Sequence, residues 1–147
     1  MAIPAIPSTA NAQSTFTVVA LPDTQVYSEI YPEIFEAQTN WVRNERFIRD
    51  VRYVSHYGDI VQNGDNLVQW LIGDAAMFTL DLEDDLPYGI NAGNHDVTAA
   101  GIPYSDYIPE LYLQFFGPQR FSDKSWFNGA SPSGMSNYQI IDAGGLE

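Results

Sequence analysis

Hydrophobic positions along the first ninety residues alternate between short continuous runs and longer stretches with helical spacing. The segments 16–21, 51–57 and 87–90 are short and rich in apolar, β-favouring residues, which predicts three buried strands. The segments 32–50 and 66–82 repeat their apolar residues every three or four positions, which predicts two amphipathic helices.

The order of these elements predicts an α/β fold, because strand, helix, strand, helix and strand follow one another along the chain. Such connections are right-handed and join parallel strands. We therefore expect a parallel or mixed sheet that is flanked by helices. Beyond residue 96 the chain is rich in Tyr, Pro and Gly, and we expect one short helix at 105–116 and another strand at 137–142.

Length and composition indicate one globular domain without thiol chemistry. The chain has 147 residues, of which 45% are hydrophobic, and it contains no cysteine. Disulfides and thiolate zinc sites are therefore excluded, and any metal must bind to Asp, Glu, Asn, Gln or His. No apolar run has the length needed to cross a bilayer, so no membrane span is expected.

The charge of the chain bears on its partners. The formal net charge is −13, so the surface repels nucleic-acid phosphates, and we expect no nucleic-acid partner. A small phosphorylated substrate would also be repelled unless cations lay between it and the protein. An acidic chain that handles phosphate therefore suggests a bound metal, although acidic composition is also an ordinary route to solubility.

The first fifteen residues form a segment outside the expected domain at 16–147. They are small, polar or Pro-containing, which is typical of a disordered tail. Ala10-Asn11-Ala12 also fits a signal-peptidase site, although no basic residue and no sustained apolar stretch precedes it. The segment is either an ordinary tail or the remnant of a secretion signal, so the location is extracytoplasmic under the second interpretation and otherwise cytoplasmic.

Potential ligands follow each of the three predicted strands. The carboxyl ends of parallel strands meet at one edge of a sheet, where ligand sites form, so side chains in these loops are expected to converge. Carboxylate, amide and imidazole groups of this kind suit hard divalent cations, and zinc accepts them as well. The loops read Asp23-Thr24-Gln25, Gly58-Asp59 and Gly93-Asn94-His95-Asp96.

These motifs, in this order, resemble those of the calcineurin-like metallophosphoesterases. That family shows Asp-x-His after its first strand, Gly-Asp after its second, and Gly-Asn-His followed by Asp or Glu after its third. The similarity extends to 18–28, 38–41 and 54–63 and covers roughly 16–147. It implies that the predicted sheet is half of a four-layer α/β/β/α sandwich.

The resemblance implies a hydrolase, a phosphatase or phosphodiesterase that cleaves phosphate mono- or diesters at two divalent metal ions. The metals would be Mn, Fe, Zn or Mg. Asp23 and Gln25 would bind the first metal, and Asn94 would bind the second through its amide oxygen. Asp59 would bridge both metals.

The same resemblance implies catalytic roles for two neighbouring residues. His95 would act at the phosphate, either by stabilising the developing negative charge or by protonating the leaving oxygen. Asp96 would orient a histidine from outside the metal site. Taken singly, a residue such as Asp23 or Asn94 could equally be an ordinary turn residue.

Two departures from the family pattern limit this interpretation. Gln25 stands where the family usually has His, and Gln is a weaker, neutral ligand. The family also supplies metal-binding histidines from later motifs, whereas this chain has only His56 and His95. His56 lies within a predicted strand, and we assign it a structural role. The chain thus resembles the N-terminal half of the family domain, and 142–145 resembles the approach to another strand, as in a C-terminally truncated domain.

Three classes of function therefore remain open. The chain is a hydrolase whose missing ligands come from water, from a second chain or from the missing C-terminal half. Alternatively, it is a non-catalytic fragment that binds one metal weakly. The third possibility is an oligomerising interaction module, in which the half-sheet pairs with a partner.

Overall fold

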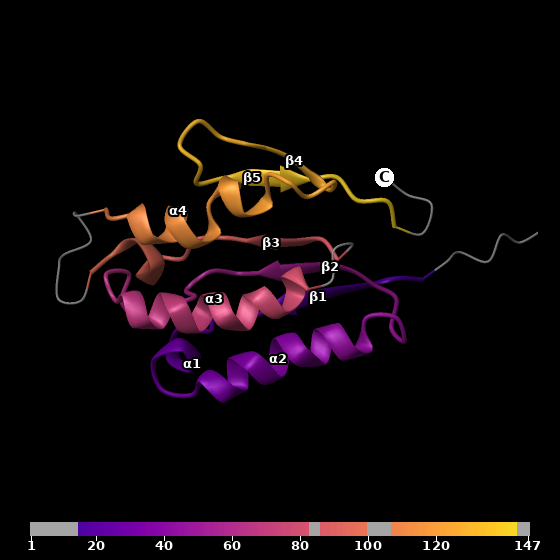
Figure 1. Cartoon of the computed structure of the whole chain (residues 1–147), viewed down its shortest axis with the longest axis horizontal. Helices are drawn as coiled ribbons and strands as arrows, with labels where there is room; N and C mark the ends of the chain where they lie inside the picture. The colour runs from indigo at the N-terminus through magenta and orange to yellow at the C-terminus, as the bar shows by residue number, and fades with distance from the viewer. Residues whose placement is uncertain (1–14, 83–85, 100–106, 144–147) are drawn as a thin grey trace, which may run out of the picture.

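The protein is built around a small parallel sheet. The computed structural model describes residues 15–82, 86–99 and 107–143. The three strands are hydrogen-bonded in sequence order, so the middle strand has a neighbour on each side. They are β1 (Thr17–Leu21), β2 (Val51–His56) and β3 (Tyr88–Ile90) (Figure 1). Because the order is sequential and the strands are parallel, right-handed crossovers place the connecting helices on the same face.

Three helices cover that face and form the core with it. They are α1 (Gln25–Glu29), α2 (Pro32–Glu45) and α3 (Leu67–Asp81) (Figure 1). Phe35 and Val42 of α2 are buried, as are Trp70 and Met77 of α3. The side chain of Asn66 caps α3 by accepting hydrogen bonds from the backbone N–H groups of its second and third residues, which are otherwise unpaired in a helix.

The C-terminal part of the chain lies on the β3 side of the sheet (Figure 1). It contains the 3₁₀ helices η1 (His95–Val97) and η2 (Pro118–Phe121), the helix α4 (Glu110–Phe116), and a hairpin of β4 (Phe127–Ala130) and β5 (Asn137–Gln139). Tyr112 of α4 donates a hydrogen bond to the carbonyl oxygen of Ile90 at 3.0 Å, which ties α4 to the end of β3. Trp70 stacks on Phe115, so α4 also packs against α3.

The structure confirms the predicted α/β class and the parallel sheet flanked by helices. Two predicted helices prove shorter than expected. The segment 32–50 is helical only to Glu45, and the chain then turns into β2 through Asp50, whose φ is 48°. The predicted helix at 105–116 begins at Glu110, directly after Pro109, because the residue before a proline disfavours helical backbone.

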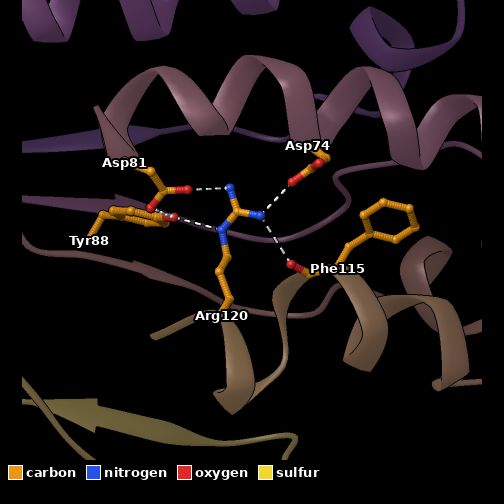
Figure 2. Close-up of polar contacts among 5 residues, drawn as sticks. All are labelled: Asp74, Asp81, Tyr88, Phe115 and Arg120. Atoms are coloured by element: carbon orange, nitrogen blue, oxygen red, sulfur yellow. Dashed lines mark hydrogen bonds and ion pairs between the residues drawn. The ribbon is translucent and has the colours of Figure 1, made fainter. Parts of the chain in front are cut away.

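A partly buried ion network, which we name the Arg120 cluster, joins the helical layer to the C-terminal part (Figure 2). The guanidinium of Arg120 donates hydrogen bonds to Asp74 and Asp81 of α3, to the hydroxyl of Tyr88 on β3, and to the carbonyl oxygen of Phe115. The Tyr88 hydroxyl in turn donates to Asp81 at 2.6 Å. One cation therefore connects α3, β3 and the end of α4.

Three predictions fall at least partly outside the described residues, and one of them is the helix expected at 105–116, of which the structure describes only 107–116. The N-terminal tail lies outside them except for Thr15, and the expected approach to another strand at 142–145 is described only to residue 143. Within the described ranges, no helix combines the length and the hydrophobicity that a membrane span requires.

Candidate functional site

The loop after β1 carries the first predicted ligands. β1 ends at Leu21, and α1 begins at Gln25, so only three residues separate strand from helix. The exposed carboxylate of Asp23 accepts a hydrogen bond from the backbone N–H of Gln25 at 2.9 Å. This turn, in which an Asp side chain pairs with the backbone two residues later, holds Asp23 at the start of α1.

The loop after β2 has a constrained backbone at the predicted bridging ligand. Gly58 has a φ of 94° and Asp59 a φ of 50°, so two successive residues adopt left-handed conformations. Such a φ is uncommon outside glycine, although Asp tolerates it better than most residues. The carbonyl oxygen of Asp59 accepts a hydrogen bond from the N–H of Thr24 at 3.0 Å, which joins the second loop to the first.

The loop after β3 packs directly on the second loop. The N–H of His95 donates a hydrogen bond to Oδ1 of Asp59 at 2.9 Å. A Cβ atom on Gly93 would overlap the Asp59 carboxylate, and a Cβ atom on Gly58 would lie 2.6 Å from the Gly93 nitrogen. The two glycines therefore permit a contact between loops that side chains would prevent. We call these three segments, 22–24, 57–66 and 91–94 together with η1, the strand-end loops.

Asp96 fastens the second and third loops together. Its Oδ1 accepts hydrogen bonds from the N–H groups of Ile60 at 2.7 Å and Val61 at 3.1 Å, and its Oδ2 accepts one from Gly93 at 2.8 Å. The side chain is fully buried, and burial raises its pKa to about 6, with a further contribution from the negative charge of Asp59. The three backbone donors act in the opposite direction.

The described contacts of Asp96 involve only the backbone, and its expected role stays a prediction. The resemblance implies that it orients a histidine, whereas its described hydrogen bonds all come from backbone amides. The physical reason is its position at the start of η1, which turns the carboxylate under the loop after β2. Asp96 therefore holds the residues that follow Asp59 against the loop that precedes His95.

His95 receives its orientation from a backbone carbonyl. Its Nδ1 lies 2.8 Å from the carbonyl oxygen of Gln62. A carbonyl oxygen can only accept, so Nδ1 must carry a hydrogen, and in the neutral ring Nε2 holds the lone pair. This arrangement leaves Nε2 as the ring atom that can give or take a proton at a ligand. Sequence reasoning missed Gln62, because any residue type can supply a carbonyl oxygen.

A second histidine supports the loops from below. His56 is fully buried at the end of β2, and its Nδ1 accepts a hydrogen bond from the N–H of Gly58 at 3.1 Å. Its Nε2 therefore carries the hydrogen and donates to Oγ1 of Thr24 at 3.0 Å. Burial lowers the pKa of His56 to about 4, so the ring is neutral near pH 7. These contacts fit the structural role that we expected for His56.

Thr24 and Ser28 are buried polar residues that the sequence did not single out. Ser28 donates to the carbonyl oxygen of Ile60 at 2.6 Å, and Thr24 lies 3.4 Å from the same oxygen. Together with His56 they link the start of α1 to the loop after β2. A Thr between two predicted ligands carries no pattern of its own, so only the fold reveals this role.

The loops that carry the predicted ligands are hydrogen-bonded to one another at one edge of the sheet, and the chemistry of those ligands suits a hard cation. Within residues 15–82, 86–99 and 107–143, no three His, Cys, Asp or Glu side chains form a group with metal-binding geometry. The expected ligand set, however, also includes the amide oxygens of Gln25 and Asn94. Oε1 of Gln25 is buried without a hydrogen-bond donor, which is costly for a carbonyl oxygen unless water or a cation satisfies it.

Comparison with known proteins identifies a relative without a described activity. The chain is 35% identical over 134 residues to the Bacillus subtilis (strain 168) protein named "Uncharacterized protein YvnB". The similarity covers 91% of this chain and 10% of the relative, so the chain spans about a tenth of the length of the curated relative that it matches. No protein-family model matches the chain. No solved structure matches it either.

Proposed function

We propose that this chain carries part of the active site of a metal-dependent phosphoesterase, which hydrolyses a phosphate mono- or diester at two divalent metal ions. The observation that supports this most strongly is the connection between the strand-end loops. The N–H of Thr24 donates to the carbonyl oxygen of Asp59, and the N–H of His95 donates to Oδ1 of Asp59, so the loops after three successive parallel strands are joined at one edge. Ligand sites of α/β proteins form at this edge.

The residues divide into metal ligands and groups that act on the ester. Asp23 and Gln25 would hold one cation, Asn94 would hold the other, and Asp59 would bridge them. When bound, the two cations would neutralise the phosphate and activate a water as the nucleophile. The acidic charge of the chain, −13, repels an anionic substrate, and bound cations would reduce that repulsion.

His95 is the candidate acid. Its Nδ1–H is held by the carbonyl oxygen of Gln62, which leaves Nε2 to deliver a proton. In the imidazolium form of His95, Nε2 also carries a hydrogen. As a hydroxide, formed when water releases one proton to solvent, bonds to phosphorus and the ester P–O bond breaks, the Nε2 hydrogen would pass to the leaving oxygen and leave His95 neutral. Asp96 would maintain the relative positions of His95 and Asp59, because it accepts three backbone hydrogen bonds from the loops that carry them.

We further propose that the sheet is half of a four-layer α/β/β/α sandwich, and that residues outside these 147 complete the metal ligands. A catalytic metal ordinarily has three or more protein ligands, whereas the second cation would have only Asp59 and Asn94 here. The remaining ligands would come from further polypeptide or from a second chain. Turnover by this chain alone is therefore expected to be low.

The test combines metal binding with hydrolysis. Free Mn²⁺ is measured by electron paramagnetic resonance during titration of the chain, and hydrolysis of bis(p-nitrophenyl) phosphate is followed in the same samples. Asp59→Asn keeps the acceptor for the His95 N–H and tolerates the left-handed backbone, but removes the charge. Asp123→Asn, at an exposed residue away from the loops, is the matched control.

The proposal predicts that Mn²⁺ binding falls at least about tenfold in Asp59→Asn and stays unchanged in Asp123→Asn, which is a difference of about 1.4 kcal/mol. Metal binding that survives Asp59→Asn would contradict the site. Specific metal binding without any hydrolysis would favour the alternative, a non-catalytic metal-binding module.

A further inference from the structure

A cavity of about 370 Å³ lies against the sheet next to the strand-end loops. Its walls come from β2, β3, the loop after β3 and the region around β5. No charged side chain is among the described residues that line it, although the chain carries a net charge of −13. Its volume lies within the range of about 300–1,000 Å³ that is common for small-molecule sites.

A chain of neutral polar side chains forms one wall of this cavity. Tyr53 of β2 donates a hydrogen bond to Oε1 of Gln139 at 2.8 Å, and Nε2 of Gln139 donates to Oδ1 of Asn137. Gly89 permits this arrangement, because a Cβ atom there would overlap the Tyr53 hydroxyl. Burial raises the pKa of Tyr53, which keeps the phenol protonated at neutral pH.

The network orients these side chains and still leaves bonding capacity for a ligand. Asn137 retains both hydrogens of its amide nitrogen, and Gln139 retains the second hydrogen of its own. The Tyr53 oxygen can still accept a hydrogen bond. Asn91 and Ser136 also line the cavity and add further neutral donors and acceptors.

This composition selects one class of ligand. A charged group would lose its water here and find no opposite charge among the described lining residues, which is costly. A wholly apolar group would leave the amides of Asn137 and Gln139 without partners. A neutral group with several hydroxyls can both donate to and accept from this wall.

The cavity also adjoins the proposed catalytic edge. Gly93 lines it, and the same residue donates its N–H to Asp96 and packs on Asp59. A phosphate held by the strand-end loops would therefore have its ester group within reach of the cavity. We propose that the cavity binds the uncharged polyhydroxylic part, a sugar or polyol, of the phosphate ester; its link to hydrolysis rests on the proposed function.

Binding is tested on the full chain without metal, by following ¹H–¹⁵N chemical shifts as methyl α-D-glucopyranoside or myo-inositol is added. We expect saturable shifts at Ser55, Gly89 and Asn137. Cyclohexanol, a six-membered ring with a single hydroxyl, is the matched ligand, and it should bind at least about tenfold more weakly because it cannot satisfy the amides.

Two variants locate the site. Asn137→Leu keeps a side chain of similar size but removes the amide, and it should weaken sugar binding about tenfold, as expected for the loss of one or two hydrogen bonds. Asn44→Leu makes the same change on the exposed surface of α2 and should leave binding unchanged. Far-ultraviolet circular dichroism of both variants checks that they fold.

The outcomes separate this proposal from the phosphoesterase proposal. Sugar binding that is lost in Asn137→Leu supports the cavity even if the chain hydrolyses no ester. Absent saturable shifts, equal binding of cyclohexanol, or equal binding by Asn137→Leu would overturn the cavity proposal, and none of these results would change the metal titration of Asp59→Asn.

Discussion

The Arg120 cluster and the strand-end loops both contain acidic side chains, but these side chains are paired with a cation in the first region and with backbone amides in the second. In the Arg120 cluster, two carboxylates meet one guanidinium whose side chain is 12% exposed, and the Tyr88 hydroxyl completes the network. In the strand-end loops, Asp59 and Asp96 accept hydrogen bonds from backbone amides, and no described ion pair joins them to a basic side chain.

This difference distinguishes carboxylates that stabilise the fold through ion pairs from carboxylates that have no cationic side chain as a partner among the described residues. Both carboxylates of the Arg120 cluster are paired with the same guanidinium, so the oxygen atoms that bind it are not open to a ligand. The strand-end loops hold Asp59 next to Asp96, whose pKa is raised in part by that neighbour. Acidic residues held close enough to repel each other lower the stability of the fold, and such pairs are typical of ligand-binding and catalytic sites.

The largest expected effect is on the Arg120 cluster. Arg120→Met leaves the largely buried Asp81 and the partly exposed Asp74 without their cation. It should lower the free energy of unfolding by about 3 kcal/mol, the lower end of the range for a buried pair, because solvent screens Asp74. Arg49→Met removes a cation from an exposed ion pair with Glu45 and should cost less than about 1 kcal/mol. Urea denaturation measures both, and equal losses would contradict the distinction.

His56 predicts how stability depends on pH. Its pKa is about 4 in the folded protein and about 6.5 in the unfolded chain. Between these values the unfolded chain binds a proton at His56 and the folded protein does not. Its contribution is therefore complete above pH 6.5 and is lost as the pH falls toward 4, by up to about 3 kcal/mol.

Asp96 acts with the opposite sign over much of the same range. Its raised pKa means that the folded protein holds a proton between about pH 4 and 6 that the unfolded chain releases, so the contribution of Asp96 to stability falls as the pH rises.

Comparison of wild type with His56→Gln isolates the contribution of the histidine. Urea denaturation at pH 7, 6, 5 and 4 should show a smaller loss toward acid in the variant, and parallel curves would contradict the buried neutral ring.

A smaller effect is expected from Asp96→Asn. The amide of Asn has one oxygen and one nitrogen, and the nitrogen cannot accept a hydrogen bond. It must face either the N–H of Gly93 or the N–H groups of Ile60 and Val61, so at least one of these donors loses its acceptor. We expect a loss of about 2 kcal/mol in the free energy of unfolding at pH 7. Asp123→Asn is the exposed control, and an unchanged stability of Asp96→Asn would show that the three backbone hydrogen bonds do not fasten the loops.

The smallest effect is expected at Asp59 in the absence of metal. Asp59→Asn keeps an oxygen for the His95 N–H and suits the φ of 50°, while it removes the charge that disfavours ionised Asp96. The free energy of unfolding should change by less than about 1 kcal/mol, or rise slightly. Asp81→Asn, within the Arg120 cluster, should by contrast destabilise the protein by about 1–3 kcal/mol. The same urea titrations measure both variants, and a larger loss in Asp59→Asn would break the comparison.

Much of the fold follows from local pattern, and the exceptions have physical reasons. The three strands show as short apolar runs, and the two long helices show as apolar residues repeated every three or four positions, so both kinds of element can be recognised. α1 has five residues, fewer than two helical turns, and β4 contains Gly129 at a φ of 156°, so neither shows a clear period. The early end of α2 depends on the turn at Asp50 and not on the apolar spacing.

The candidate site could likewise be predicted only in part from the sequence. The polar residues after each strand are visible in the sequence, and parallel topology predicts that they meet. The partners that hold them are less visible, because the carbonyl oxygen of Gln62 and the amides bonded by Asp96 belong to the backbone. The Arg120 cluster could not be predicted, since Arg120 lies 46 and 39 residues from Asp74 and Asp81 along the chain.

The most direct test measures the free energy of unfolding with and without Mn²⁺ for wild type, Asp59→Asn and Asp81→Asn. A cation that binds only the folded protein stabilises it according to its concentration and affinity, by about 2.7 kcal/mol at one hundred times the dissociation constant. We predict that Mn²⁺ stabilises wild type and Asp81→Asn alike and loses its effect in Asp59→Asn. Equal stabilisation of all three proteins, or of none, would contradict the assignment of the strand-end loops as a metal site.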